Sequence, residues 1–161
     1  MKNLKLSVKL MGGFVVVAII TLAVGMAGWL GVSNSQKVAQ EVKGVSDINA
    51  EMLQREIDHM AWARRVGQFQ RNENMTALEV EKDTHKCAFG KWYYGDQRKA
   101  AEAKIPGIAP LLKQVEDPHT KLHNSAVELE KILQKGKEHR GEALAYFQSE
   151  TGTHLANVQK V

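Results

Sequence analysis

The segment LLKQVEDPHTKLHNSAVELEKIL, residues 111–133, predicts a helix with one apolar face. Its apolar positions and one histidine recur in steps of four and three, the spacing of a single helix face; they are Leu111, Val115, His119, Leu122, Ala126, Leu129 and Leu133. Pro118 lies inside this pattern. Either it kinks one continuous helix, or Asp117 caps a new helix with Pro118 in its first turn. Gly136 is expected to end the helix.

Helical patterns continue on both sides of this segment. Residues 33–72 carry a similar stripe, formed by Val45, Ile48, Met52, His59, Trp62, Val66 and Phe69. A further long helix is expected from Glu138 to about Lys160, and shorter ones over 76–83 and 96–104. A compact turn is expected at 87–95 and a chain break at 105–107. The predicted fold class is all-α, with an N-terminal transmembrane helix followed by an antiparallel four-helix bundle.

The transmembrane prediction comes from residues 10–32, which contain no charged residue. As a helix, a segment of this length rises roughly 35 Å, enough to cross the hydrocarbon core of a bilayer. The alternative is a cleaved signal peptide, whose apolar region is typically about 7–15 residues long and ends at a small-residue site. The apolar run here is longer, so a retained anchor is predicted.

The net charge of +4 is unevenly distributed along the 161 residues. Lys2, Lys5 and Lys9 precede the apolar run, whereas no acidic residue occurs before Glu41. This asymmetry predicts a cytoplasmic amino terminus at the inner membrane and argues against nucleic-acid binding. The predicted organisation is a basic tail at 1–9, a transmembrane helix at 10–32, and a periplasmic sensor domain at 33–161.

A candidate metal site combines the only cysteine, Cys87, with three histidines. His119 and His123 are four residues apart, which places both imidazoles on one helix face. His59 lies in the apolar stripe of another predicted helix, where an uncharged imidazole needs a partner. One Cys and three His suit tetrahedral Zn²⁺. The predicted metal ligands are therefore His59, Cys87, His119 and His123.

Other interpretations of these residues stay open at this point. Each histidine alone is more often a packed core residue than a ligand, and His85 is a competing ligand close to Cys87. Acceptors for the imidazole N–H groups are expected among Asp58, Glu116 and Asp117. The aromatic residues suit a core or the lining of a small-ligand pocket; they are Trp62, Trp92, Tyr93 and Tyr94. No catalytic constellation stands out, so an enzyme is not expected.

Three motifs together give the chain a resemblance to a known family. They are Asp58-His59-Met60-Ala61-Trp62, Cys87-Ala88-Phe89-Gly90-Lys91-Trp92-Tyr93-Tyr94, and Pro118-His119 with His123. Over roughly residues 50–135 this combination resembles the chemoreceptor zinc-binding domain. The resemblance implies a four-helix bundle that binds zinc through the four residues above. It also implies attachment to a chemoreceptor or a cyclic-dinucleotide enzyme.

The better-known members of that family are cytoplasmic, whereas this copy follows a predicted membrane span. The expected function is therefore that of the extracytoplasmic sensor of a methyl-accepting chemotaxis protein, which passes zinc or redox signals across the membrane. A homodimer and a second membrane span beyond residue 161 are expected. The alternative functions are a sensor for a small organic ligand, with zinc structural or absent, and a purely structural helical module.

Overall fold

The computed structural model describes residues 5–105 and 107–160. Every regular element in these ranges is a helix, and no strand occurs in them. The prediction of an all-α chain with a long apolar helix at its N-terminal end is confirmed. The chain divides into two compact units, Met1–Gly44 and Val45–Val161.

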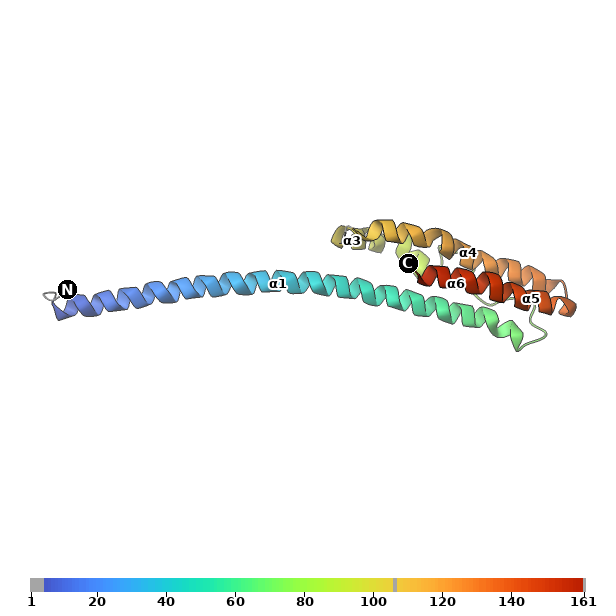
Figure 1. The fold of residues 1–161 in the computed structure, drawn as a ribbon, viewed down its shortest axis with the longest axis horizontal. Coiled ribbons are helices and arrows are strands. Elements are labelled where there is room, and N and C mark those ends of the chain that lie inside the picture. The colour runs from blue at the N-terminus through green and yellow to red at the C-terminus, as the bar shows by residue number, and fades with distance from the viewer. Residues whose placement is uncertain (1–4, 106, 161) are drawn as a thin grey trace. The chain divides into compact units, whose positions relative to one another are not determined.

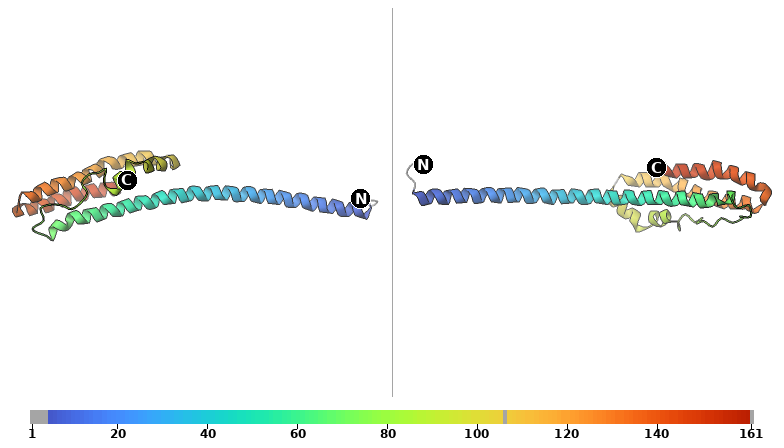
Figure 2. Two further views of the ribbon diagram at one scale, coloured as in Figure 1. Left: turned by 180° about the vertical axis from the view of Figure 1, so that it is seen from behind. Right: turned by 90° about the horizontal axis from the view of Figure 1, so that it is seen from below.

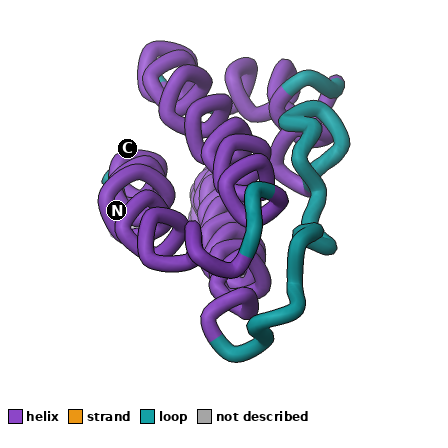
Figure 3. Tube along the Cα trace, turned by 90° about the vertical axis from the view of Figure 1, so that its right-hand side faces the viewer, coloured by secondary structure: helices purple, strands orange, loops and turns teal. Residues whose placement is uncertain are grey.

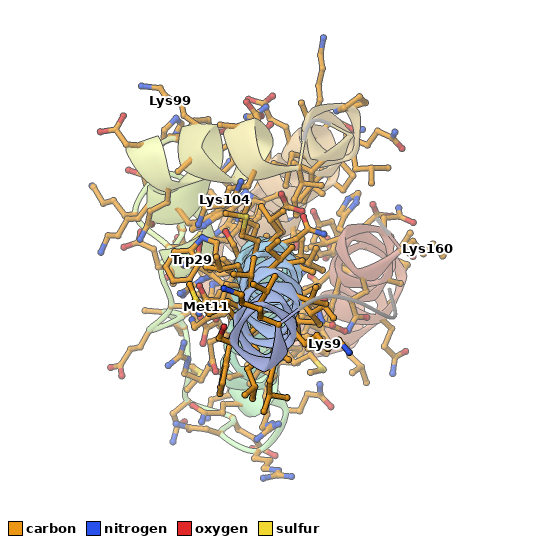
Figure 4. All side chains as sticks on the ribbon, turned by 90° about the vertical axis from the view of Figure 1, so that its left-hand side faces the viewer. Lys9, Met11, Trp29, Lys99, Lys104 and Lys160 are labelled. Carbon is orange, nitrogen blue, oxygen red and sulfur yellow. The ribbon has the colours of Figure 1, made fainter. Side chains whose placement is uncertain are left out.

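The first unit consists of the N-terminal part of helix α1, which spans Leu6–Val66. Consecutive apolar side chains in this part are exposed, such as Phe14, Val15, Val16 and Val17. Because consecutive residues of a helix point in different directions, no polar face is left over. Met11 and Trp29, labelled in Figure 4, are also exposed on this unit.

Within the described residues, one helix is long and apolar enough to cross a membrane by its length and composition. A signal sequence near an N-terminus satisfies the same criteria. Of the three lysines on which the predicted orientation rests, Lys5 and Lys9 are described and Lys2 lies outside the described residues.

The second unit holds all other elements. They are the end of α1, the 3-10 turn Gly67–Gln70, α2 (Ala88–Tyr93), α3 (Asp96–Lys104), α4 (Ile108–Gln134), the 3-10 turn Lys137–His139, α5 (Arg140–Tyr146), the π-helical turn Phe147–Thr151 and α6 (Gly152–Gln159). Figure 1 shows α4 beside the run formed by α5 and α6. α4 runs in the same direction as the end of α1, and α5–α6 runs in the opposite direction (Figures 1 and 2).

Helix α4 passes through Pro118 without a break. Of the two interpretations of this proline, one continuous helix is confirmed, and a new helix capped by Asp117 is wrong. Packing of the apolar face outweighs the one hydrogen bond that proline removes. Gly136, at φ 131°, follows the end of α4 as predicted.

Two local predictions between α1 and α4 are wrong. Residues 76–83 form no helix, and residues 87–95, predicted as a turn, contain the short helix α2. The non-helical segment of residues 71–87 runs along the outside of the helices as the long loop in Figure 3. Glu130 of α4 accepts hydrogen bonds from the Leu78 backbone N–H and the Lys82 ammonium group. These contacts with a distant helix favour an extended path over a helix of its own.

The core of the second unit consists of two apolar clusters. One contains Trp62, Val66, Leu122, Ala126 and Leu129 together with their neighbours. The other is centred on Ile48, Phe89, Trp92, Leu112 and Val115. Along the chain, His59 on α1 and His119 on α4 fall between these two sets, and His123 directly follows Leu122. The polar imidazoles are thus held between apolar clusters, away from bulk water.

Candidate metal centre

His59 lies on α1 and is almost fully buried. Its Nδ1 atom is 2.7 Å from the backbone carbonyl oxygen of Arg55, one turn earlier on the helix. A carbonyl only accepts hydrogen bonds, so Nδ1 carries the proton and Nε2 carries the free lone pair. Nε2 is buried and has no hydrogen-bond partner among the described residues.

His119 and His123 lie one turn apart on α4, with ring centroids 4.7 Å from each other. Both are buried, at 1% and 0% exposure. His123 repeats the pattern of His59: its Nδ1 is 2.9 Å from the Glu81 carbonyl oxygen, and its buried Nε2 has no partner in the described chain. The ring of His59 lies 5.0 Å from that of His119.

Cys87 reaches these rings from the start of α2. It is the N-cap residue of that helix, and its sulfur accepts a hydrogen bond from the Gly90 N–H at 3.1 Å. The same sulfur is 3.3 Å from Nε2 of His119. Gly90 is needed here because a Cβ atom at this position would lie 1.7 Å from the Thr84 carbonyl oxygen. The tight turn before α2 therefore aims the sulfur at the histidines.

The structure brings together all four residues that the sequence singled out. One ligand atom from each of His59, Cys87, His119 and His123 lies within 4.8 Å of the other three. Ligand atoms around a tetrahedral zinc are about 3.3–3.8 Å apart, given bonds of roughly 2.0–2.3 Å. The arrangement is thus within a small side-chain movement of a zinc-binding geometry. The unpartnered Nε2 atoms of His59 and His123 give the fit a physical reason, because a metal would satisfy both lone pairs.

Burial sets the charge state of the cluster. It lowers the pKa of His119 to about 3 and that of His123 to about 4, and it also lowers the pKa of His59. Neighbouring imidazoles act in the same direction: His123 and His59 lower the pKa of His119, and His59 lowers the pKa of His123, because two positive charges would lie close together. Burial raises the pKa of the Cys87 thiol. Near neutral pH the three imidazoles are uncharged, which is the form that binds metal.

The acceptors of the imidazole N–H groups differ from the predicted ones. Backbone carbonyls take this role for His59 and His123. Asp58 instead binds Arg55 and Gln54, Glu116 accepts from Tyr93 and Tyr94, and Asp117 pairs with Lys121. The prediction that these three carboxylates support the histidines is wrong. Every residue has a carbonyl, so this partner leaves no mark in the sequence.

His85, the competing ligand, is not part of the cluster. Its side chain is largely exposed and stacks on the ring of Tyr94 at 4.0 Å between centroids. Its backbone N–H is bound by Asp83, which fixes the turn ahead of Cys87. Of the aromatic residues, Trp62, Trp92 and Tyr93 are buried, and Tyr94 is exposed.

Residues 59–130 match the chemoreceptor zinc-binding domain. The match confirms the resemblance seen in the sequence, and it contains all four clustered residues. The name of this domain identifies zinc as its metal, and zinc is therefore the metal assigned to the cluster of His59, Cys87, His119 and His123. None of the curated proteins and none of the solved structures compared with the chain matches it.

Sequence reasoning missed one functional role at the candidate metal centre, that of Trp62. Its indole N–H donates to the Glu81 carbonyl oxygen at 2.7 Å, the same oxygen that accepts from His123. The rings of Trp62 and His123 also pack with centroids 5.0 Å apart. Trp62 thus positions the acceptor of a candidate ligand. The Asp-His-x-x-Trp spacing was its only signal in the sequence.

Replacing Trp62 by phenylalanine is expected to weaken zinc binding by about tenfold or more, as the loss of partners that orient metal ligands typically does. Phenylalanine keeps an apolar ring but cannot hold the Glu81 carbonyl in place. The measurement is zinc affinity by competition with a chelator. Trp92→Phe is the control, because Trp92 is equally buried and lies in the other apolar cluster. An unchanged affinity in Trp62→Phe would contradict this role.

The metal-free protein is expected to lose stability as the pH falls from 7 to 5. The folded-state pKa values of the buried histidines lie below the ordinary 6.5, so the unfolded chain binds more protons in this range. The loss begins near pH 6.5 and continues toward the folded-state values of about 3 and 4. Urea unfolding at several pH values measures it. His119→Phe should flatten the dependence, and a flat wild-type profile would refute the prediction.

Proposed function

We propose that this chain is the membrane-anchored sensory region of a bacterial chemoreceptor that binds zinc through His59, Cys87, His119 and His123. The observation that carries the proposal is the convergence of four ligand atoms from three segments of the chain, two of them buried nitrogens without a partner. The match to the chemoreceptor zinc-binding domain supports both the metal and the receptor context. The proposed protein is a sensor, not an enzyme, and it does not bind nucleic acid.

In this proposal the apolar helix is retained as an anchor in the inner membrane, with residues 33–161 in the periplasm. Its length and composition support a membrane span, and Lys5 and Lys9 on its N-terminal side support a cytoplasmic amino terminus. A homodimer and a second span after residue 161 belong to the same proposal. Alkaline phosphatase fused after Val161 should be active, since it matures only outside the cytoplasm; an inactive but stable fusion would reverse the orientation.

The helices of residues 33–161 are proposed to act as a four-helix bundle. Three of its helices would be α1, α4 and the run formed by α5 and α6. The short helices α2 and α3 lie between α1 and α4 in the sequence. Zinc contacts would tie α1, α2 and α4 together. Gain or loss of those contacts changes how α1 packs, and packed helix interfaces move between discrete arrangements.

A hybrid receptor tests the signalling function. Residues 1–161 are joined to the second span and signalling region of another chemoreceptor, and kinase output is followed while zinc or a chelator is added. We expect output to change with zinc and the response to be lost in His119→Ala. The exposed His85→Ala variant is the matched control and should respond like the parent. A response that survives His119→Ala would exclude this site as the sensor.

Redox signalling through Cys87 is part of the proposed function. Oxidation would remove the thiolate, which is the form that binds metal. Zinc-loaded protein treated with an oxidant is therefore expected to release zinc, and reduction of a sulfenic acid or mixed disulfide should restore binding. Unchanged zinc content after complete oxidation of Cys87 would remove the redox role and leave zinc sensing in place.

A further inference from the structure

A cavity of about 390 Å³ lies against the metal cluster, between α1, α2 and the loop that precedes α2 in Figure 3. Three of the four candidate ligands line it, namely His59, Cys87 and His123. Exposed residues line it as well, such as Arg65 of α1 and Lys86 of the loop. This space, the polar cavity, therefore joins the buried cluster to the protein surface.

Within the cluster, the cysteine is the ligand that solvent reaches most easily. Cys87 is partly exposed, whereas His59, His119 and His123 are at most 4% exposed. Cys87 lines the polar cavity, and His119 does not. Because buried side chains pack too closely to let an ion pass, a metal has to approach from a side where the protein is open. The polar cavity provides such an opening at Cys87.

Charged residues make the polar cavity suitable for a hydrated cation. Asp58 and Glu81 line it with acidic groups, and Arg65 and Lys86 line it with basic groups. Besides burial, the negative charge of Glu81 raises the pKa of the Cys87 thiol, so this carboxylate acts on the sulfur. Moving an ion into surroundings that form no hydrogen bonds is costly. Charged walls keep water in the passage, and Glu81 attracts a cation toward the sulfur.

A second cavity offers the competing route. It has a volume of about 320 Å³, lies between α1, α4 and α6, and includes only His59 of the four candidate ligands. Its walls are mainly apolar, with Met52 from α1 and Leu112 and Val115 from α4. A hydrated ion would lose its water there without gaining ligands. This apolar cavity is therefore the less favourable path.

We propose that zinc enters and leaves the metal cluster through the polar cavity, which the small side chains of Ala61 and Ala88 keep open. This route rests on the proposed zinc function, and it sets the speed at which the site follows a change in zinc concentration. The dissociation constant is the ratio of the release rate to the uptake rate. An obstacle in the passage slows both rates by the same factor, so it leaves the affinity unchanged.

Two substitutions obstruct the polar cavity from different helices, Ala61→Trp on α1 and Ala88→Trp on α2. Stopped flow on the full chain in lipid nanodiscs measures zinc release to an excess of a chromogenic chelator, and Co²⁺ uptake by the absorption of its thiolate complex. Each variant should slow both rates at least about tenfold and keep its zinc affinity within about threefold. Leu111→Trp is the control, because Leu111 is exposed and lines the apolar cavity. Unchanged rates in both alanine variants, or equal slowing in Leu111→Trp, would overturn the proposal.

A measurement without metal separates this route from the proposed function. In the metal-free protein, the rate at which iodoacetamide alkylates Cys87 reports access through the polar cavity. Ala61→Trp should lower that rate at least about tenfold, and Leu111→Trp should leave it unchanged. Equal alkylation rates in the parent and in Ala61→Trp would overturn the route. A parent that takes up no zinc, together with slower alkylation in Ala61→Trp, would refute the zinc function and not the passage to Cys87.

Discussion

Replacing Cys87 by alanine is expected to reduce bound zinc from about one ion per chain to almost none in the presence of a moderate chelator. Structural zinc sites contribute roughly 10–16 kcal/mol through four ligands, so the loss of one costs about 3 kcal/mol, or more than a hundredfold in affinity. The loss is more severe for the sulfur, because it supplies the single negative charge of the ligand set. Elemental analysis of the full chain, purified under reducing conditions without a histidine tag, measures it.

The controls for this experiment come from the same region of the chain. His123→Ala should lose zinc to a similar extent, since its buried Nε2 has no other partner in the described residues. His85→Ala should keep its zinc, because this neighbour of Cys87 is exposed and stacks on Tyr94. Full zinc retention in Cys87→Ala, or no zinc in the parent after loading, would exclude the proposed ligand set.

Replacing Gly90 by alanine is expected to destabilise the domain by about 3 kcal/mol, near the upper end of ordinary single substitutions. The added Cβ would lie 1.7 Å from the Thr84 carbonyl oxygen and 3.0 Å from the backbone of His85. Neither group belongs to a flexible side chain, so the turn before α2 has to open. Because that turn also aims the Cys87 sulfur, zinc affinity should fall together with stability.

Urea unfolding and zinc competition measure the two effects in Gly90→Ala. Gly141→Ala is the matched control, because a Cβ there meets no atom within 4 Å. In the helix α5 this control should be neutral or stabilising by up to about 1 kcal/mol. A stable Gly90→Ala protein with unchanged zinc affinity would show that the turn has room for a side chain.

The helices could be predicted because their signals are local. The apolar positions from Leu111 to Leu133 give the period of α4, and Gly136 marks the chain just after its end. The helix predicted over residues 76–83 is absent. Glu130 and Trp62, far away in sequence, hold the extended path of this segment through Leu78, Lys82 and Glu81.

The candidate ligands could be named for a related reason. Few residue types bind zinc, so one cysteine and a histidine pair at helical spacing limit the choices strongly. Their partners could not be named in the same way. The groups that orient His59 and His123 are the backbone carbonyls of Arg55 and Glu81.

The sequence by itself determined the all-helical class, the apolar N-terminal helix and the four residues suited to hold a metal. These properties follow from periodicity, composition and side-chain chemistry, which each segment carries alone. The tertiary structure decided that His85 stays outside the cluster, that Trp62 and His123 share one carbonyl, and that the Cys87 sulfur lies 3.3 Å from Nε2 of His119. Such relations arise only when distant segments meet, because burial and hydrogen-bond partners depend on packing.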